Sequence, residues 1–170
     1  MSDKSFSNEL ERALARPDAD KLIRQIDAYI EYDRKGGGEW PDEISDDLSE
    51  VLDANQYDPD KALAYVMIAA ARTDDPGFLA FMGAGPLENI LYDPSPELLD
   101  RIVDEARKTA RFRWLLSVPY KIAITDRAWD SIKQFRITGD HEEPTAESLP
   151  VRTRYLRSLR RPQTSSTSRP

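Results

Sequence analysis

The sequence predicts an all-α fold, a compact multi-helix domain of stacked antiparallel helix pairs with a flexible C-terminal tail. Three observations predict it. Apolar residues recur every three to four positions along most of the chain, as they do on one face of a helix. Prolines and capping residues stand where these stretches begin. No segment alternates apolar and polar residues over a useful length, and the apolar run 120–124 would be a strand without a partner.

The N-terminal third is expected to form three helices. The first lies within residues 1–17 and ends at a proline. The second begins at Asp18 or Asp20 and ends at glycines 36–38, which are costly to hold in a helix. The third follows Pro41 and has acidic first turns, where the helix dipole favours negative charge. The apolar stripes are Phe6, Leu10, Ala13 and Leu14; Leu22, Ile23, Ile26, Tyr29 and Ile30; and Ile44, Leu48, Val51 and Leu52.

The next helix is the most apolar of the chain, and we expect it at the centre of the fold. It begins at Asp58-Pro59, where a cap precedes a proline suited to the first helical position, and it runs to about Thr73. A shorter helix begins at Asp75-Pro76 in the same way. The apolar residues of the two helices are Leu63, Val66, Met67 and Ala70, and Phe78, Leu79, Phe81 and Met82.

A Gly-Ala-Gly-Pro run then predicts a break between two helices. Gly83 suits the left-handed position that follows a helix, Gly85 suits a cap, and Pro86 suits the first position of the next helix. Leu87 is expected to point inward, and Glu88 to lie near the unpaired amides of the helix start. These five residues form a signature to which we assign structural roles.

Three further helices are expected in residues 96–108, in residues 112–118 and from Thr125 or Asp126 onward. The sequence before and within the first of them resembles an earlier part of the chain. Asp93-Pro94 follows Asp58-Pro59 by 35 residues, and the residues after the two dipeptides agree in part. This spacing favours repeated helix pairs. The alternative is that similar caps and stripes match by chance.

From residue 139 onward the composition changes, because prolines interrupt the chain and Ser and Arg become frequent. We therefore divide the chain into a helical domain, residues 1–138, and a basic tail, residues 139–170, that we expect to be partly disordered. An alternative is a short basic helix docked on the acidic body. Its apolar residues would be Leu149, Val151, Tyr155, Leu156 and Leu159.

Composition excludes several classes of protein. The 170 residues include 24 Lys and Arg, 31 Asp and Glu, one His and no Cys, and the net charge is −7. Without Cys there is no disulfide scaffold, thiolate metal site or Cys nucleophile, and one His excludes a multi-His metal centre. No apolar run approaches the ~20 residues of a membrane span. The N-terminus lacks the apolar core of a secretory signal. We expect a cytoplasmic protein without a metal, a cofactor or a membrane partner.

The residues that could carry catalysis have structural explanations. His141 stands in a polar stretch without a nucleophile motif, so we expect it to be solvated. The glycines at 83 and 85 lack the third glycine of a dinucleotide fingerprint. Neighbouring carboxylates are abundant, but they fall at helix starts and on polar faces. We therefore expect no enzyme.

Charge is distributed unevenly along the chain, since the first two thirds are acidic and the last third is basic. The two parts either neutralise each other within one fold or mark an interaction surface. Basic residues beside aromatic ones are typical of single-strand nucleic-acid binding, but because the domain is acidic we expect no nucleic-acid partner. The basic residues concerned are Arg107, Lys108, Arg111, Arg113, Arg152, Arg154, Arg157, Arg160 and Arg161, near Phe112, Trp114 and Tyr155.

Residues 81–91, FMGAGPLENIL, resemble the signature of an uncharacterised bacterial family that carries a phrase close to GAGPLEDLL. The resemblance extends over about residues 58–120, with an acidic helix, an Ala-Arg pair and an aromatic helix following in order. Asn89 replaces the commoner Asp, and Pro119-Tyr120 stands where Trp is frequent. The resemblance implies a small helical bacterial protein, and it implies no activity because the family is a domain of unknown function.

The leading hypothesis for function is a non-catalytic protein-binding module, such as an immunity or antagonist protein that neutralises a basic partner. One alternative is a helical-repeat scaffold that binds a peptide in a groove lined by Tyr65, Phe78 or Phe112. A more distant alternative is a carboxylate-based hydrolase. The oligomeric state is left open. The candidate partner-binding residues are Trp40, Asp42, Glu43, Asp46, Asp47 and Glu50.

Overall fold

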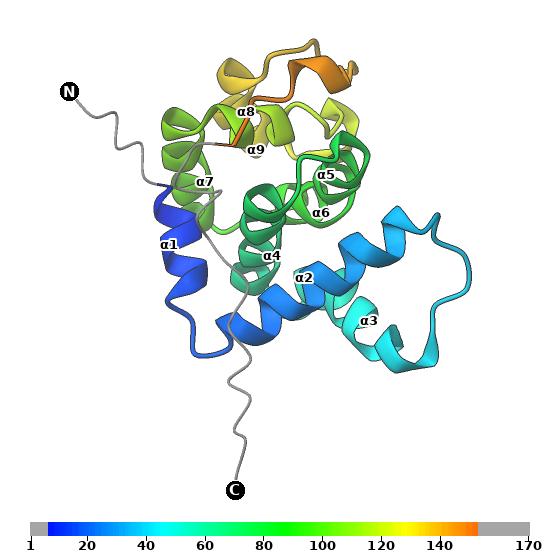
Figure 1. Ribbon diagram of the computed structural model, residues 1–170. Coiled ribbons are helices and arrows are strands. Elements are labelled where there is room, and N and C mark those ends of the chain that lie inside the picture. Colours follow the sequence, from blue (N-terminus) through cyan, green and yellow to red (C-terminus); the bar gives the residue numbers. More distant parts are fainter. Residues whose placement is uncertain (1–6, 153–170) are drawn as a thin grey trace, which may run out of the picture.

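A computed structural model describes residues 7–152, and within this range the chain is helical and contains no strand (Figure 1). The prediction of an all-α fold is therefore confirmed. The α-helices are α1 (Asn8–Leu14), α2 (Ala19–Arg34), α3 (Asp42–Tyr57), α4 (Pro59–Arg72), α5 (Pro76–Met82), α6 (Glu88–Tyr92), α7 (Pro96–Lys108), α8 (Ala110–Leu116) and α9 (Asp126–Ile132). Short 3₁₀ turns occupy Lys121–Ala123, Lys133–Phe135 and Ala146–Ser148.

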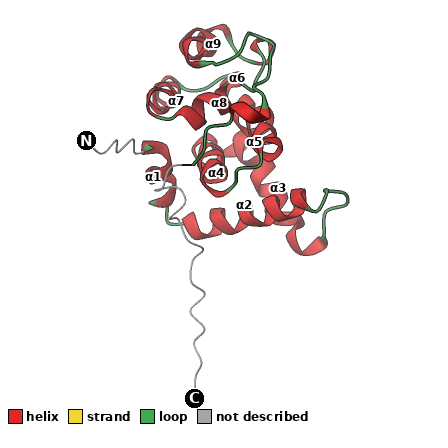
Figure 2. Ribbon diagram, turned by 45° about the horizontal axis from the view of Figure 1, so that its top comes forward, coloured by secondary structure: helices red, strands yellow, loops and turns green. Residues whose placement is uncertain are grey.

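Helix α4 is the centre of the molecule, as its sequence predicts. All its residues from Ala62 to Ala71 are buried, so the helix is covered on every side. Figures 1 and 2 show α1 on one side of it, the α2–α3 hairpin on another and the later helices above. The buried hydroxyl of Tyr65 donates to Gln25 Oε1 at 2.5 Å, which satisfies a polar group that burial would otherwise penalise.

The α2–α3 hairpin lies at one edge of the molecule in both views, and its loop points away from the other helices (Figures 1 and 2). Gly36, Gly37 and Gly38 all have positive φ, between 67° and 108°, which non-glycine residues rarely adopt. Tyr32 donates its hydroxyl to Gly38 O at 2.5 Å. The glycines therefore allow a tight reversal that returns the chain to α3.

The predicted break at the Gly-Ala-Gly-Pro run is wrong. Gly83–Leu87 is a π-helical segment that continues α5 directly into α6, and Pro86 lies inside it. Gly83 has φ −72°, so it takes no left-handed conformation, and Gly85 and Pro86 start no new helix. Gly83 is needed for another reason. A Cβ placed there would lie 2.8 Å from Val118 Cβ, so only glycine lets the two segments approach this closely.

The helices after α6 begin and end close to their predicted positions. α7 spans the predicted range, with Ser95 Oγ accepting from Leu98 N at 3.2 Å as its cap. The apolar run near residue 122 is a 3₁₀ turn rather than a strand. α4 begins at Pro59 and α7 at Pro96, so their starts are two residues out of register with the 35-residue match. Repeat-like packing therefore stays a prediction.

Residues 139–152, which we assigned to the start of the tail, lie against the helical body. Trp114 Nε1 donates to Thr145 O at 3.2 Å and to Ser148 Oγ at 3.1 Å. Arg152 donates to Asp74 and to Ala71 O, at the C-terminal end of α4. Of the apolar residues of the alternative docked helix, Leu149 packs against the core and Val151 is 78% exposed. The other three, Tyr155, Leu156 and Leu159, lie outside the described residues, so the docked helix stays a prediction. Phe6 and the predicted basic residues beyond Arg152 lie outside the described residues.

Candidate functional site

Helix α3 has two chemically distinct faces. Its inner face buries Leu48, Val51 and Ala54. Positions 42, 46, 53 and 57 succeed one another at intervals of four, seven and four residues, so their side chains share the opposite face. All four are exposed, and Tyr57 is 83% exposed. We call Asp42, Asp46, Asp53 and Tyr57 the acidic stripe.

The carboxylates of the acidic stripe are not neutralised by other side chains. Within residues 7–152, none of the three aspartates forms an ion pair or a side-chain hydrogen bond with another residue. Glu43, next to Asp42, is exposed and equally without an ion pair in this part of the chain. The outer face of α3 therefore presents its full negative charge to solvent.

Glu50 belongs to the interior of the hairpin instead. Its carboxylate accepts from Lys21 Nζ at 3.1 Å, from Gln25 Nε2 at 2.8 Å and from Lys61. The hydrogen bonds from Lys21 and Lys61 lower the pKa of Glu50 to about 2. This carboxylate connects α3 to both α2 and α4.

Asp47 also serves this internal network. Gln25 Nε2 donates to Asp47 Oδ1 at 3.1 Å, while Gln25 Oε1 accepts from the buried hydroxyl of Tyr65. Burial raises the pKa of Tyr65, which keeps the hydroxyl as a donor. A chain of hydrogen bonds thus runs from α3 through α2 into the core. The structure therefore divides the six predicted residues into two groups.

Four of the predicted partner-binding residues lie on the open surface. Asp42, Glu43 and Asp46 are exposed on α3, and Trp40, which is 36% exposed, precedes the helix. Sequence reasoning missed Asp53 and Tyr57, although their spacing from Asp42 already placed them on its face. It also grouped Asp47 and Glu50 with the exposed acids, because their partners come from other helices.

The signature residues have packing roles. Gly83, Pro86 and Leu87 are buried in the π-helical segment, and Gly83 contacts Val118. Burial raises the pKa of the Glu88 carboxyl, against the opposing effect of a hydrogen bond from the Tyr120 backbone.

The other candidate residues from the sequence do not form a site. The groove prediction is wrong in its residues, because Tyr65, Phe78 and Phe112 are all buried in the core. His141 packs edge-to-face against Tyr120, with ring centroids 5.9 Å apart. In the described part of the chain, no cluster of three His, Asp or Glu side chains is arranged to hold a metal ion.

In the basic and aromatic cluster around α8, Arg111 and both aromatic residues are buried, whereas Arg107 and Lys108 are exposed. The Arg111 side chain is 7% exposed, and its guanidinium donates to Thr73 O at 2.7 Å and Pro150 O at 2.6 Å. Burial lowers the pKa of Arg111. Phe112 and Trp114 are buried, so they offer no stacking platform to a nucleic-acid base. Among the described residues, no helix combines the length and apolarity that crossing a membrane requires.

The fold and this surface define an all-helical domain with an acidic helix displayed at its edge. The chain belongs to a family of unknown function, DUF6869, whose model matches residues 38–139. The match extends from the hairpin loop through α9 and includes the whole acidic stripe. Comparison with curated proteins gave no match, and neither did comparison with solved structures.

Proposed function

We propose that the protein is a non-catalytic protein-binding module that binds a basic partner through the acidic stripe of α3. One observation carries the proposal. Glu50 is neutralised by two lysines and Asp47 is hydrogen-bonded to Gln25, whereas the three aspartates of the stripe and Glu43 face solvent without a side-chain partner in the described residues. Unneutralised charge on one helix face steers association with a partner of opposite charge.

Two aromatic side chains supply apolar contact area at the ends of the stripe. Trp40 stands before the first turn of α3, and Tyr57 is its last residue. Trp and Tyr are enriched among the residues that dominate interface energies. Aromatic groups at both ends of an acidic helix face favour a protein partner whose basic side chains flank apolar pockets.

In this proposal the protein is a cytoplasmic bacterial antagonist of the immunity type. It covers the basic functional surface of its partner and thereby blocks access to it. The stripe lies within the part of the chain that matches the family model, so the same surface is available for comparison in other family members.

The test is an affinity pull-down from the native host with three versions of the full chain, at low and at moderate salt. The stripe variant carries Asp42→Asn, Asp46→Asn and Asp53→Asn. The control variant carries Glu97→Gln, Asp100→Asn and Asp126→Asn, which are exposed on α7 and α9 and remove the same charge. Circular dichroism checks that all three versions keep their helix content.

We expect the unmodified chain and the control variant to capture the same basic protein at low salt, with less captured as salt rises. The stripe variant is expected to lose it. Capture of that protein by the stripe variant at the level of the control would overturn the proposal. Failure of the unmodified chain to capture any protein at either salt concentration would overturn it as well.

A further inference from the structure

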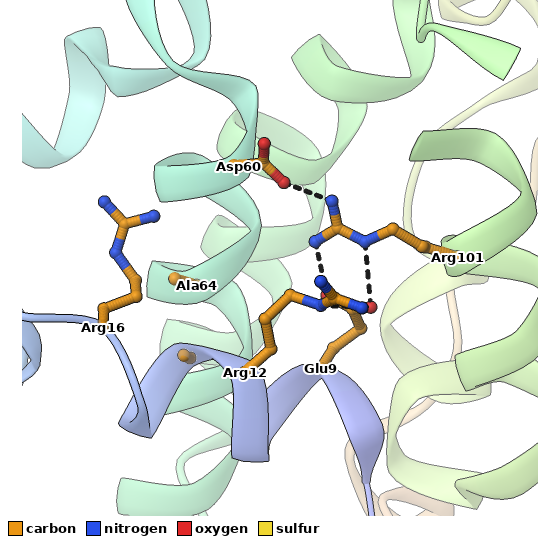
Figure 3. A pocket seen from close by; sticks show the side chains of 7 residues that line it. Glu9, Arg12, Arg16, Asp60, Ala64 and Arg101 are labelled. Carbon is orange, nitrogen blue, oxygen red and sulfur yellow. Dashed lines mark hydrogen bonds and ion pairs between the residues drawn. The ribbon is translucent and has the colours of Figure 1, made fainter. Parts of the chain in front are cut away.

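A cavity of about 200 Å³ opens between α1, α4 and α7, apart from the acidic stripe (Figure 3). Its volume is about that of seven water molecules at ~30 Å³ each, which suits a small molecule rather than a peptide. Ala13 and Ala64 are both buried, and their small side chains leave the space open. Its charged lining residues are Glu9, Arg12, Arg16, Asp60 and Arg101.

Arg101 is held in place by two carboxylates. Its Nε donates to Glu9 Oε1 at 3.1 Å and its Nη2 to Glu9 Oε2 at 2.7 Å, a two-pronged pairing. Its Nη1 donates to Asp60. Figure 3 shows Arg101 between these two acids, and the pairing raises its pKa. This trio forms a fixed wall of the cavity.

Arg12 and Arg16 keep donors available. Arg12 is 62% exposed, and its closest carboxylate among the described residues is Glu9 at 3.6 Å, too far for a hydrogen bond. Arg16 uses Nε and Nη2 for Asp18, at 2.8 and 3.3 Å. Its Nη1 donates to no group in the described residues. A guanidinium has five N–H donors, so both side chains can bind a further anionic group.

The surrounding charges decide which kind of molecule fits. Asp18 and Asp58 stand beside Arg16, the latter at 3.8 Å, so three guanidiniums face four carboxylates in all. A multiply charged anion such as phosphate would be repelled by these acids. A carboxylate that carries its own ammonium group adds no net charge, and Asp60 is an exposed acceptor for that ammonium.

We propose that this cavity binds a small zwitterion of the amino-acid type, with its carboxylate on Arg12 and Arg16 and its ammonium group on Asp60. None of its lining residues belongs to the acidic stripe, so the site goes beyond the proposed function and its test is independent of the pull-down. Residues 9–16 of the lining precede the part of the chain that the family model matches.

The test titrates the full chain with a panel of free amino acids at millimolar concentration, followed by amide NMR shifts. Inorganic phosphate and methylamine serve as probes with only one of the two charges. We expect at least one amino acid to shift resonances of α1 and the first turns of α4, and neither phosphate nor methylamine, each of which carries charge of one sign only, to do so. Shifts with phosphate and with no amino acid would overturn the proposal, as would no shift with any amino acid.

Three variants locate the binding. Arg12→Gln removes an exposed guanidinium and is expected to weaken binding about tenfold or more. Arg24→Gln is the matched control, because Arg24 is exposed on α2 and outside the cavity, and its affinity should equal that of the unmodified chain. Ala64→Leu fills the cavity without changing a charge and should also weaken binding. Equal affinities in Arg12→Gln and Arg24→Gln would overturn the proposal, even if Ala64→Leu fails to fold.

Discussion

In the α2–α3 hairpin, charged side chains pair with other side chains, whereas from α8 to residue 152 every arginine donates to at least one backbone carbonyl. Lys21 and Lys61 bind Glu50 in the first region. In the second, Arg136 donates to Leu116 O at 2.8 Å and Pro119 O at 2.6 Å, and Arg113 to Ala106 O at 2.8 Å. Basic side chains therefore join helices to one another in the first region, and they hold loops and helix ends in the second.

The difference follows from what each region lacks. In the long helices α2 and α3 most backbone groups pair within the helix, and the charges of the hairpin join α2, α3 and α4. The later helices are short, and their last carbonyls have no helical partner. A guanidinium with five donors can satisfy several of these carbonyls at once. Part of the basic charge of the last third is therefore used inside the fold rather than to neutralise the acidic half.

The largest expected effect is at Arg111, where the backbone-binding role is most buried. Arg111→Met leaves Thr73 O and Pro150 O without this donor, while Asp74 keeps Arg152, and we expect a loss of about 2–4 kcal/mol in the free energy of unfolding. Urea denaturation measures it. Arg107→Met, which removes a surface pair with Asp104, is the control and should cost far less. Equal losses in the two variants would show that the hydrogen bonds from Arg111 to the carbonyls stabilise the fold no more than a surface ion pair does.

Substituting a glycine is expected to change the free energy of unfolding less, and glycines have different roles in the two regions. The hairpin glycines are needed for positive φ, whereas Gly83 is needed for close contact with Val118. Gly83→Ala should cost about 1–3 kcal/mol in thermal or urea unfolding. Gly85→Ala, with no atom within 4 Å of its Cβ, should be neutral or stabilising by about 0.5 kcal/mol. The prediction fails if the two variants are equally stable.

The smallest effect is expected at Glu50, in the more exposed region. Its pKa falls from the ordinary 4.5 to about 2 on folding, so it stabilises the fold above pH 4.5 and loses this effect as the pH approaches 2. Because the side chain is about one third exposed, we expect Glu50→Gln to cost about 1 kcal/mol at neutral pH. Unfolding measured from pH 7 to pH 2 should show the two proteins converging. A constant difference would contradict the prediction.

Helix positions were predictable because their signals are local. Asp58-Pro59 starts α4 and Ser95 caps α7, and each cap acts on amides within three residues. The apolar content of α4 likewise predicted its central place. The Gly-Ala-Gly-Pro break failed because residue type alone does not show whether glycine serves φ or a close contact. That distinction depends on Val118, which is 35 residues further along the chain.

The candidate surface was predictable only in part. The sequence by itself determined that α3 carries many acids, that their spacing places some outward, and that the chain is all-α. Only the tertiary structure decided that Asp47 and Glu50 accept hydrogen bonds from Gln25. It also decided that arginines of the last third donate to backbone carbonyls, and that Glu9 and Arg101 line a cavity. The physical reason is separation along the chain. Glu9 and Arg101 are 92 residues apart, and packing around α4 alone brings them within hydrogen-bond distance.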